Sequence, residues 1–267
     1  MKDQVQYSRS HQLPGLVLGE ARLAKFRFKR HFHLDYHIGV ITEGVQRQIL
    51  HGENMVLTPG TIQLMPPGEM HDGFSADDGF YTLKTFRVAP EMLDGLAQEI
   101  SGAGGQLGDA VLLDPAAAYR LSRLHAALQD GETASPLQLQ ADWLTLLEHL
   151  LSRTSLRTPE MVHGELSASQ RTRVREYCEA RLADKLSLDE LAALCGIERF
   201  KFLKLFKRTT GMTPHAWLVR LRLERACSLM TSARQDLTQV AHAVGFYDQS
   251  HFNRAFRSAY GVAPSQY

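Results

Sequence analysis

Apolar residues come in short runs over the first third of the chain, and Gly, Pro and Asn separate the runs. They lie at residues 37–41, 46–50, 55–57 and 62–65, within a stretch that extends from residue 16 to residue 88. Many short strands at this spacing are typical of an antiparallel sandwich or barrel. The pattern therefore predicts that the N-terminal part is an antiparallel β-barrel.

After position 90 the apolar residues recur at three and four positions, which indicates helices. We expect a short helix at 91–100, a loop at 101–108, and helices at 115–128 and 136–152 that each open with a proline. The last helix carries an apolar stripe made of Leu139, Trp143, Leu146, Leu147, Leu150 and Leu151. A broad stripe either covers the barrel or forms a dimer seam, and both interpretations stay open here.

A polar segment at residues 154–167 contains Pro159 and Gly164, which is typical of a linker. It separates an N-terminal domain, residues 1–153, from a C-terminal domain, residues 168–267, whose apolar spacing is helical throughout. The predicted fold class is α+β, with an antiparallel β-barrel plus helices followed by an all-α domain.

The helical domain contains an internal repeat, in which residues 186–214 match residues 236–264. The turn glycines Gly196 and Gly245 correspond, as do Phe206 and Phe256. Solenoids need three or more copies of a repeat, so two copies indicate a paired functional unit.

Each copy has the pattern of a helix-turn-helix. Ser187 and Thr238 are placed to cap the first helix, and Glu190 completes a capping box with Ser187. The glycine supplies a tight turn that needs a left-handed residue. The second helices are then expected at 199–210 and 249–260.

The outward faces of these second helices are rich in hydrogen-bond donors for phosphates and base edges. The candidate DNA-contacting residues are Arg199, Phe200, Lys201, Leu203, Lys204, Gln249, Ser250, His251, Asn253, Arg254 and Arg257. Residues 168–267 hold 16 lysines and arginines against 9 aspartates and glutamates, whereas residues 1–167 hold 14 against 20. A basic helical part beside an acidic remainder predicts that double-stranded DNA is a partner.

One helix at residues 214–230 joins the two units. At 1.5 Å per residue it spans roughly 25 Å, so it can hold two recognition helices about one DNA turn, roughly 34 Å, apart.

The C-terminal hundred residues resemble the DNA-binding domain of the AraC/XylS family of transcription regulators, most clearly in GFYDQSHFNRAFRSAYGVAPSQY at 245–267. The resemblance implies that base-reading positions fall at Phe200, Leu203 and Lys204 and between Gln249 and Arg254. It also implies activation of a promoter through RNA polymerase, a small-molecule effector and a homodimer.

Four histidines in the N-terminal domain form a second constellation: His31, His33, His37 and His71. On a strand, His31 and His33 are expected to share one face. The spacing of the four, with Gly44, Gly60, Pro66 and Gly68, resembles the two cupin motifs, although His37 stands where the motif has Glu. Converging imidazoles suit Zn, Ni, Mn or Fe as a divalent metal. The alternative is an effector pocket in which the same histidines hydrogen-bond a ligand.

The leading hypothesis is therefore an effector-responsive, DNA-binding transcription regulator that is not an enzyme. The alternatives are a direct metal sensor and a metal-dependent cupin enzyme fused to a DNA-binding module, with Asp35, Tyr36 and Glu69 as its acid–base candidates. The longest apolar stretch is too short to span a membrane, and the N-terminus is polar. We expect a cytoplasmic location, no membrane partner, and three reduced, buried cysteines.

Overall fold

The computed structural model describes residues 2–76, 79–101, 108, 110–130, 135–154, 164–232 and 236–267. The described residues divide into two compact units, the first formed mainly by residues 1–157 and the second mainly by residues 158–259. The predicted loop at 101–108 and linker at 154–167 lie largely outside the described residues.

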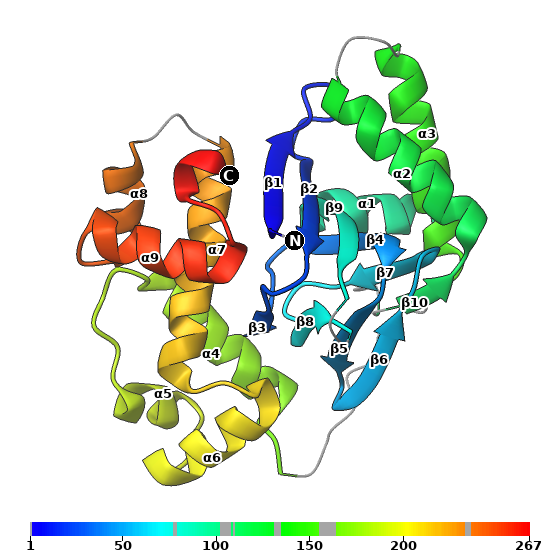
Figure 1. Cartoon of the computed structure of the whole chain (residues 1–267). Coiled ribbons are helices and arrows are strands. Elements are labelled where there is room, and N and C mark those ends of the chain that lie inside the picture. Colours follow the sequence, from blue (N-terminus) through cyan, green and yellow to red (C-terminus); the bar gives the residue numbers. More distant parts are fainter. Residues whose placement is uncertain are drawn as a thin grey trace. The chain divides into compact units, whose positions relative to one another are not determined.

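Antiparallel strands build the N-terminal unit (Figure 1). They are β1 (Gln4–Arg9), β2 (Val17–Leu23), β3 (Phe28–His31), β4 (Tyr36–Gly44), β5 (Gln46–Leu50), β6 (Glu53–Leu57), β7 (Thr61–Met65), β8 (His71–Ser75), β9 (Tyr81–Val88) and β10 (Ala110–Leu113). One sheet has the order β1-β2-β9-β4-β7-β10, and the other has the order β3-β8-β5-β6. The predicted antiparallel β-architecture and α+β class are confirmed. The two edge strands of the larger sheet, β1 and β10, lie outside the predicted strand region and were not predicted.

Three helices follow the strands: α1 (Pro90–Ser101), α2 (Pro115–Asp130) and α3 (Pro136–Leu151). Helices α2 and α3 lie side by side against the larger sheet (Figure 1). Ile38, Ile62 and Phe86 of that sheet belong to the same core as the six apolar residues of the α3 stripe. The Trp143 ring stacks 5.4 Å from Phe86. The stripe therefore covers the sheet, and the dimer-seam interpretation of these six residues is wrong because they are buried within their own unit.

A buried histidine lies where α2 meets the sheet. The Nε2 atom of His125 is 3.0 Å from the carbonyl oxygen of Gly19, and the side chain is fully buried. Burial, together with the charge of Lys84, lowers the pKa of His125 from 6.5 to about 4. The native protein therefore keeps this imidazole neutral at pH values where the unfolded chain protonates it.

This difference predicts a pH-dependent stability. The contribution is complete above about pH 6.5 and is lost as the pH falls towards 4, because only the unfolded state gains the proton. Between pH 7 and pH 5 the free energy of unfolding should fall by about 2 kcal/mol more in the wild type than in His125→Gln. Urea unfolding at both pH values measures this, and parallel losses in the two proteins would contradict it.

Helices make up the second unit: α4 (Ala168–Ala180), α5 (Leu188–Leu194), α6 (Arg199–Thr210), α7 (Pro214–Ser232), α8 (Leu237–Ala243), α9 (Gln249–Tyr260) and the short 3-10 helix η1 (Pro264–Gln266). The predicted bounds of α6 and α9 are confirmed, and α7 is two residues longer than predicted. Ser187 and Glu190 form the predicted capping box. Thr238 does not cap α8, because Asp236 occupies the N-cap and Thr238 lies within the helix.

The cysteines are core residues. Cys178, Cys195 and Cys227 are buried and form no disulfide among the described residues. Burial raises the pKa of the Cys178 thiol to about 12, so this side chain is an unreactive part of the packing.

Candidate DNA interface and histidine cluster

Helices α6 and α9 bury and expose the same positions. Phe202 and Phe206 of α6 are buried, and Phe252 and Phe256 of α9 occupy the equivalent places. From the second residue onward, the sequence of exposed, intermediate and buried side chains in α9 repeats that of α6 position by position. The two helices therefore pack in the same way and present equivalent outer faces.

The candidate DNA-contacting residues fall on these outer faces. Eight are exposed: Arg199, Phe200, Lys201, Lys204, Ser250, His251, Arg254 and Arg257. Leu203, Gln249 and Asn253 are only partly exposed. Lys204 and Arg254 form no ion pair within the described part of the chain, whereas Arg199 lies 3.8 Å from the carboxylate of Asp189. Both cations at the equivalent positions are thus available for a polyanion.

Two of the predicted readers, Gln249 and Asn253, are partly turned towards the interior. The hydroxyl of Thr238 donates to the Gln249 side-chain oxygen at 3.1 Å, which leaves the amide NH2 of Gln249 for a base edge. The Asn253 side-chain oxygen is buried. Asp248 precedes α9 and accepts a 2.6 Å hydrogen bond from the backbone of His251, so it orders the first turn of the recognition helix.

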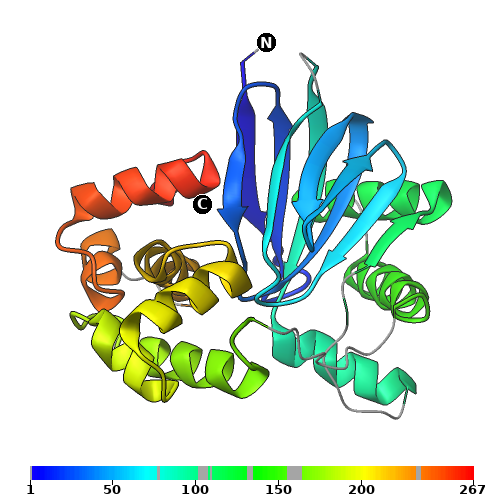
Figure 2. The same ribbon diagram turned by 90° about the horizontal axis from the view of Figure 1, so that it is seen from below.

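Helix α7 connects the two helix-turn-helix units and is buried on nearly all sides. Leu221, Leu223, Ala226 and Cys227 are among its buried residues. Its nineteen residues correspond to about 28 Å, with α6 near its N-terminal end and α8 near the other (Figure 1). In Figure 2 the view runs along α7, and α6 (yellow) and α9 (red) lie on different sides of it.

A single arginine on α7 bonds to the turn of the second helix-turn-helix unit and to the segment just before the first. Arg222 donates to the carbonyl oxygen of Gly245 at 2.9 Å and to that of Asp184 at 3.1 Å. Gly245 is the turn of the second unit, and Asp184 lies just before the first. Burial lowers the pKa of Arg222. The sequence did not single out this residue, because it is one of three arginines between positions 220 and 225 of α7.

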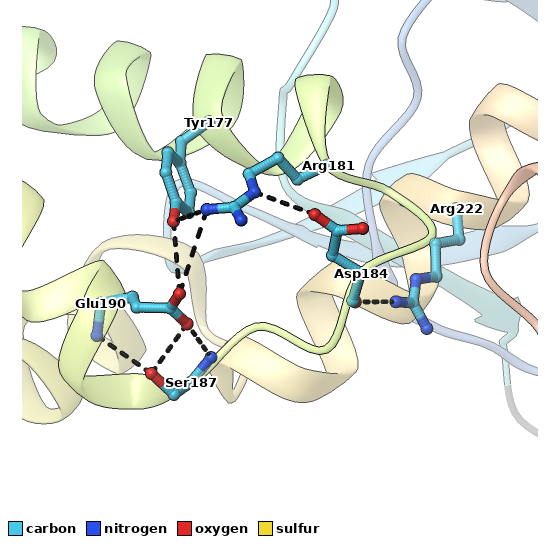
Figure 3. Close-up of polar contacts among 6 residues, drawn as sticks. All are labelled: Tyr177, Arg181, Asp184, Ser187, Glu190 and Arg222. Carbon is cyan, nitrogen blue, oxygen red and sulfur yellow. Dashed lines mark hydrogen bonds and ion pairs between the residues drawn. The ribbon is translucent and has the colours of Figure 1, made fainter.

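Figure 3 shows the polar network on the first unit. The backbone N–H of Ser187 donates to the Glu190 carboxylate at 2.7 Å, and this bond is the main reason that the pKa of Glu190 is lowered. Tyr177 of α4 donates to the same carboxylate at 3.4 Å, and Arg181 donates to Tyr177 and to Asp184. The network joins α4, the loop before α5 and α5 itself.

In the N-terminal unit, three of the four candidate histidines converge. One ring nitrogen from each of His31, His33 and His71 lies within 4.8 Å of the others, and all three side chains are buried. His31 and His71 are direct partners across β3 and β8. The expectation that His31 and His33 share a strand face is wrong, because β3 ends at His31. A backbone bond of 2.8 Å from Gly68 to the carbonyl of His33 instead joins the two motifs.

His37 lies outside this group of three. Its ring stacks on that of His33, with centroids 3.5 Å apart and planes 12° apart. The three acid–base candidates of the enzyme hypothesis each have another partner, which for Glu69 is His51, 3.4 Å from its carboxylate. Arg87 pairs with Asp35 at 2.9 Å, and Tyr36 donates to Asp94 at 2.7 Å.

The matches to known families agree with these two units. Residues 13–147 match the family model of the AraC-like ligand binding domain. The chain belongs to the AraC/XylS family. Residues 170–267 match a helix-turn-helix domain. This AraC-family chain is a DNA-binding transcription regulator with an N-terminal ligand-binding domain.

Curated relatives span most of the chain. The HTH-type transcriptional activator RhaS of Escherichia coli is 26% identical over 250 residues, which cover 92% of this chain and 89% of RhaS. The transcriptional regulator YbfI of Bacillus subtilis is 27% identical over 227 residues, covering 84% of this chain and 81% of YbfI. Such relatives favour a regulator over the enzyme and metal-sensor alternatives.

Solved structures show the same fold. An apo form of a ToxT variant from Vibrio cholerae aligns with a TM-score of 0.64 at 14% identity, covering 97% of this chain and 98% of ToxT. A ToxT structure with a bound unsaturated fatty acid aligns with a TM-score of 0.60 at 15% identity, covering 94% of each chain. Within the described residues, the helices fall short of the length and apolarity needed to cross a membrane.

Proposed function

We propose that this AraC-family regulator places α6 and α9 in two successive major grooves on one face of the duplex. The observation that carries this proposal is the repetition of the α6 burial pattern in α9. Equivalent packing gives both helices an exposed cationic face, with Lys204 and Arg254 at matching positions. A rod of about 28 Å is suited to holding them roughly one DNA turn apart.

The two helices differ in chemistry, which supports different modes of base reading. Phe200 is 74% exposed on α6, and an exposed aromatic ring suits thymine methyl groups or groove shape. Helix α9 offers Ser250, His251 and Arg254 as hydrogen-bonding groups. The second unit is therefore the one expected to discriminate bases by direct hydrogen bonds.

The effector is proposed to bind between the two sheets of the N-terminal unit. Gln48 is 1% exposed, and neither polar atom of its side chain has a hydrogen-bond partner among the described residues. The same holds for the side-chain nitrogen of Gln63, which alternates with the core residues Ile62 and Leu64 and so faces away from α2 and α3. Because a buried unpaired amide costs about 1–3 kcal/mol, a small ligand with polar groups would stabilise this interior.

Apolar residues line the rest of the same interior. Leu23, Ile41 and Tyr81 of the larger sheet pack with Leu57 of the smaller one. A ligand with one polar and one apolar part fits such a lining. Its binding would bias DNA affinity only through a difference in affinity for the DNA-competent state.

The DNA interface is tested with Arg254→Ala. Loss of a base-reading arginine should weaken operator binding by about 1–3 kcal/mol, or roughly 5- to 150-fold, and relax preference at one base pair. The operator is first selected from a random-sequence library with the wild-type chain. Affinities for the selected site and for unrelated DNA are then measured at one salt concentration.

Arg175→Ala is the matched control. It removes the same charge from the exposed surface of α4, so it should lower operator and unrelated affinities equally and slightly. An Arg254→Ala protein that binds and discriminates like the Arg175→Ala protein would overturn the placement of α9 in the groove.

Further aspects of function are proposed from the relatives. RhaS is named an activator, which supports promoter activation and contact with RNA polymerase. The relatives are transcriptional regulators, which supports a protein without enzymatic activity that works in the cytoplasm, where bacterial DNA lies. Leu137 and Leu144 are 75% and 49% exposed one heptad apart on α3, and they support a homodimer through a face other than the buried stripe.

A further inference from the structure

Backbone carbonyls set the tautomer of two imidazoles in the histidine cluster. The Nδ1 atom of His31 is 2.6 Å from the carbonyl oxygen of Lys29, and the Nδ1 atom of His71 is 3.1 Å from that of Glu69. A carbonyl oxygen only accepts, so each Nδ1 must carry the hydrogen. The lone pair of each neutral ring is therefore on Nε2. This is how proteins prepare a histidine to ligate a metal, with the other ring nitrogen donating to a carbonyl or carboxylate.

The same contact between Nδ1 and a backbone carbonyl occurs on both paired strands. His31 and His71 face each other across β3 and β8, and each bonds to the carbonyl two residues before it. The ring centroids of His31 lie 4.3 Å from His71 and 4.8 Å from His33. The rings of His31 and His71 are thus each held by a main-chain hydrogen bond.

The spacing of the nitrogens fits one ion. Metal–imidazole bonds of about 2.0–2.1 Å in a tetrahedral site place the nitrogens about 3.3 Å apart. One ring nitrogen from each of the three histidines lies within 4.8 Å of the others. The nitrogens therefore need to move closer together by about 1.5 Å at most to bind one ion. Small side-chain rotations can supply such a movement.

The donor set selects the kind of ion. All three donors are imidazole nitrogens, and the group of three includes no carboxylate or thiolate. Imidazole suits zinc, nickel and iron(II), whereas magnesium, calcium and manganese prefer oxygen donors. The stacking of His37 on His33 leaves three protein ligands, so a fourth position stays open to a small molecule or water.

We propose that His31, His33 and His71 bind one divalent transition-metal ion, with zinc, nickel and iron(II) favoured over manganese. The proposal is separate from the DNA interface, since it concerns metal binding by the chain without DNA. Its failure would leave the placement of α6 and α9 untouched.

The test uses the full, untagged chain after treatment with a chelator and removal of the chelator. Zinc binding is measured by calorimetry and by metal analysis after dialysis, for the wild type, His33→Gln and His71→Gln. The matched control is His11→Gln, which replaces an exposed histidine of the same unit. The wild type and the control should bind one zinc per chain, and the two site variants should bind it more than about 100-fold more weakly.

A measurement on the wild type keeps the test independent of how the variants fold. X-ray absorption at the zinc edge should report three imidazole ligands at about 2.0 Å. Magnesium in place of zinc should give neither binding heat nor a higher unfolding temperature. The proposal is overturned if the wild type retains no zinc, if all four proteins retain it alike, or if the bound zinc has fewer than three imidazole ligands.

Discussion

Glu224→Leu should destabilise the second unit by about 3–5 kcal/mol, because it removes one partner of a buried ion pair. Glu224 and Arg220 lie one turn apart on α7, 0% and 4% exposed, with their side chains 2.7 Å apart. The substitution leaves the Arg220 guanidinium buried without this carboxylate. The loss is a large fraction of the roughly 5–15 kcal/mol that typically stabilises a domain. Urea unfolding followed by circular dichroism, with hydrogen exchange of the α7 amides, measures it.

The double variant Arg220→Met/Glu224→Leu separates the charge from the packing. Replacing both partners by apolar residues of similar size removes the cost of desolvation together with the attraction. We expect the double variant to unfold within about 1 kcal/mol of the wild type, or to be more stable. A single variant as stable as the wild type, or a double variant no better than the single one, would show that the pair is not the source of the effect.

Gly245→Ala should cost about 2–5 kcal/mol, from two causes that act together. Gly245 has φ +86°, and a left-handed residue with a side chain costs about 1–2 kcal/mol. An added Cβ would also lie 2.3 Å from the carbonyl oxygen of Leu182 and 2.9 Å from the Cα of Ala183. Backbone cannot rotate away as a side chain can, so overpacking adds about 1–3 kcal/mol. The unfolding free energy is measured by urea titration of the full chain.

Gly196→Ala is the matched control, because it changes the equivalent turn of the other unit. Gly196 has φ +66°, and an added Cβ there would meet no atom of the described residues within 4 Å. Only the backbone cost of about 1–2 kcal/mol is expected. Gly245→Ala should also lower operator affinity more than Gly196→Ala, since Arg222 bonds to the Gly245 carbonyl. Equal losses in the two variants would contradict the close approach of Leu182 and Gly245.

Local sequence determined much of the helical unit. The spacing of Phe202 and Phe206, repeated in Phe252 and Phe256, predicted α6 and α9 to the residue. The capping box of Ser187 and Glu190 was predictable because its two partners are three residues apart on one turn. Signals of this kind act between near neighbours in the chain, so they survive without knowledge of the fold.

Interactions between residues that are distant in sequence were not predictable from local spacing. Threonine is a residue type that often caps helices, yet the Thr238 hydroxyl donates to Gln249, eleven residues later. The apolar stripe of α3 fitted two interpretations in the sequence. Its packing against the larger sheet decides between them. Arg222 resembles the other arginines of α7 in sequence, and only the fold brings the carbonyl oxygens of Asp184 and Gly245 within its hydrogen-bond distance.

For the histidines, the motif spacing identified the residue types, and the sheet register decided which of them meet. His31 and His71 are forty residues apart and become neighbours only because β3 pairs with β8. His33 joins them from beyond the end of its strand, and His37 turns to stack on it instead of joining them. Helix periods and caps are set by energies within a single turn of chain, and sequence alone therefore determined them. Contacts across a sheet depend on which strands pair and in which register, and only the tertiary structure decided these.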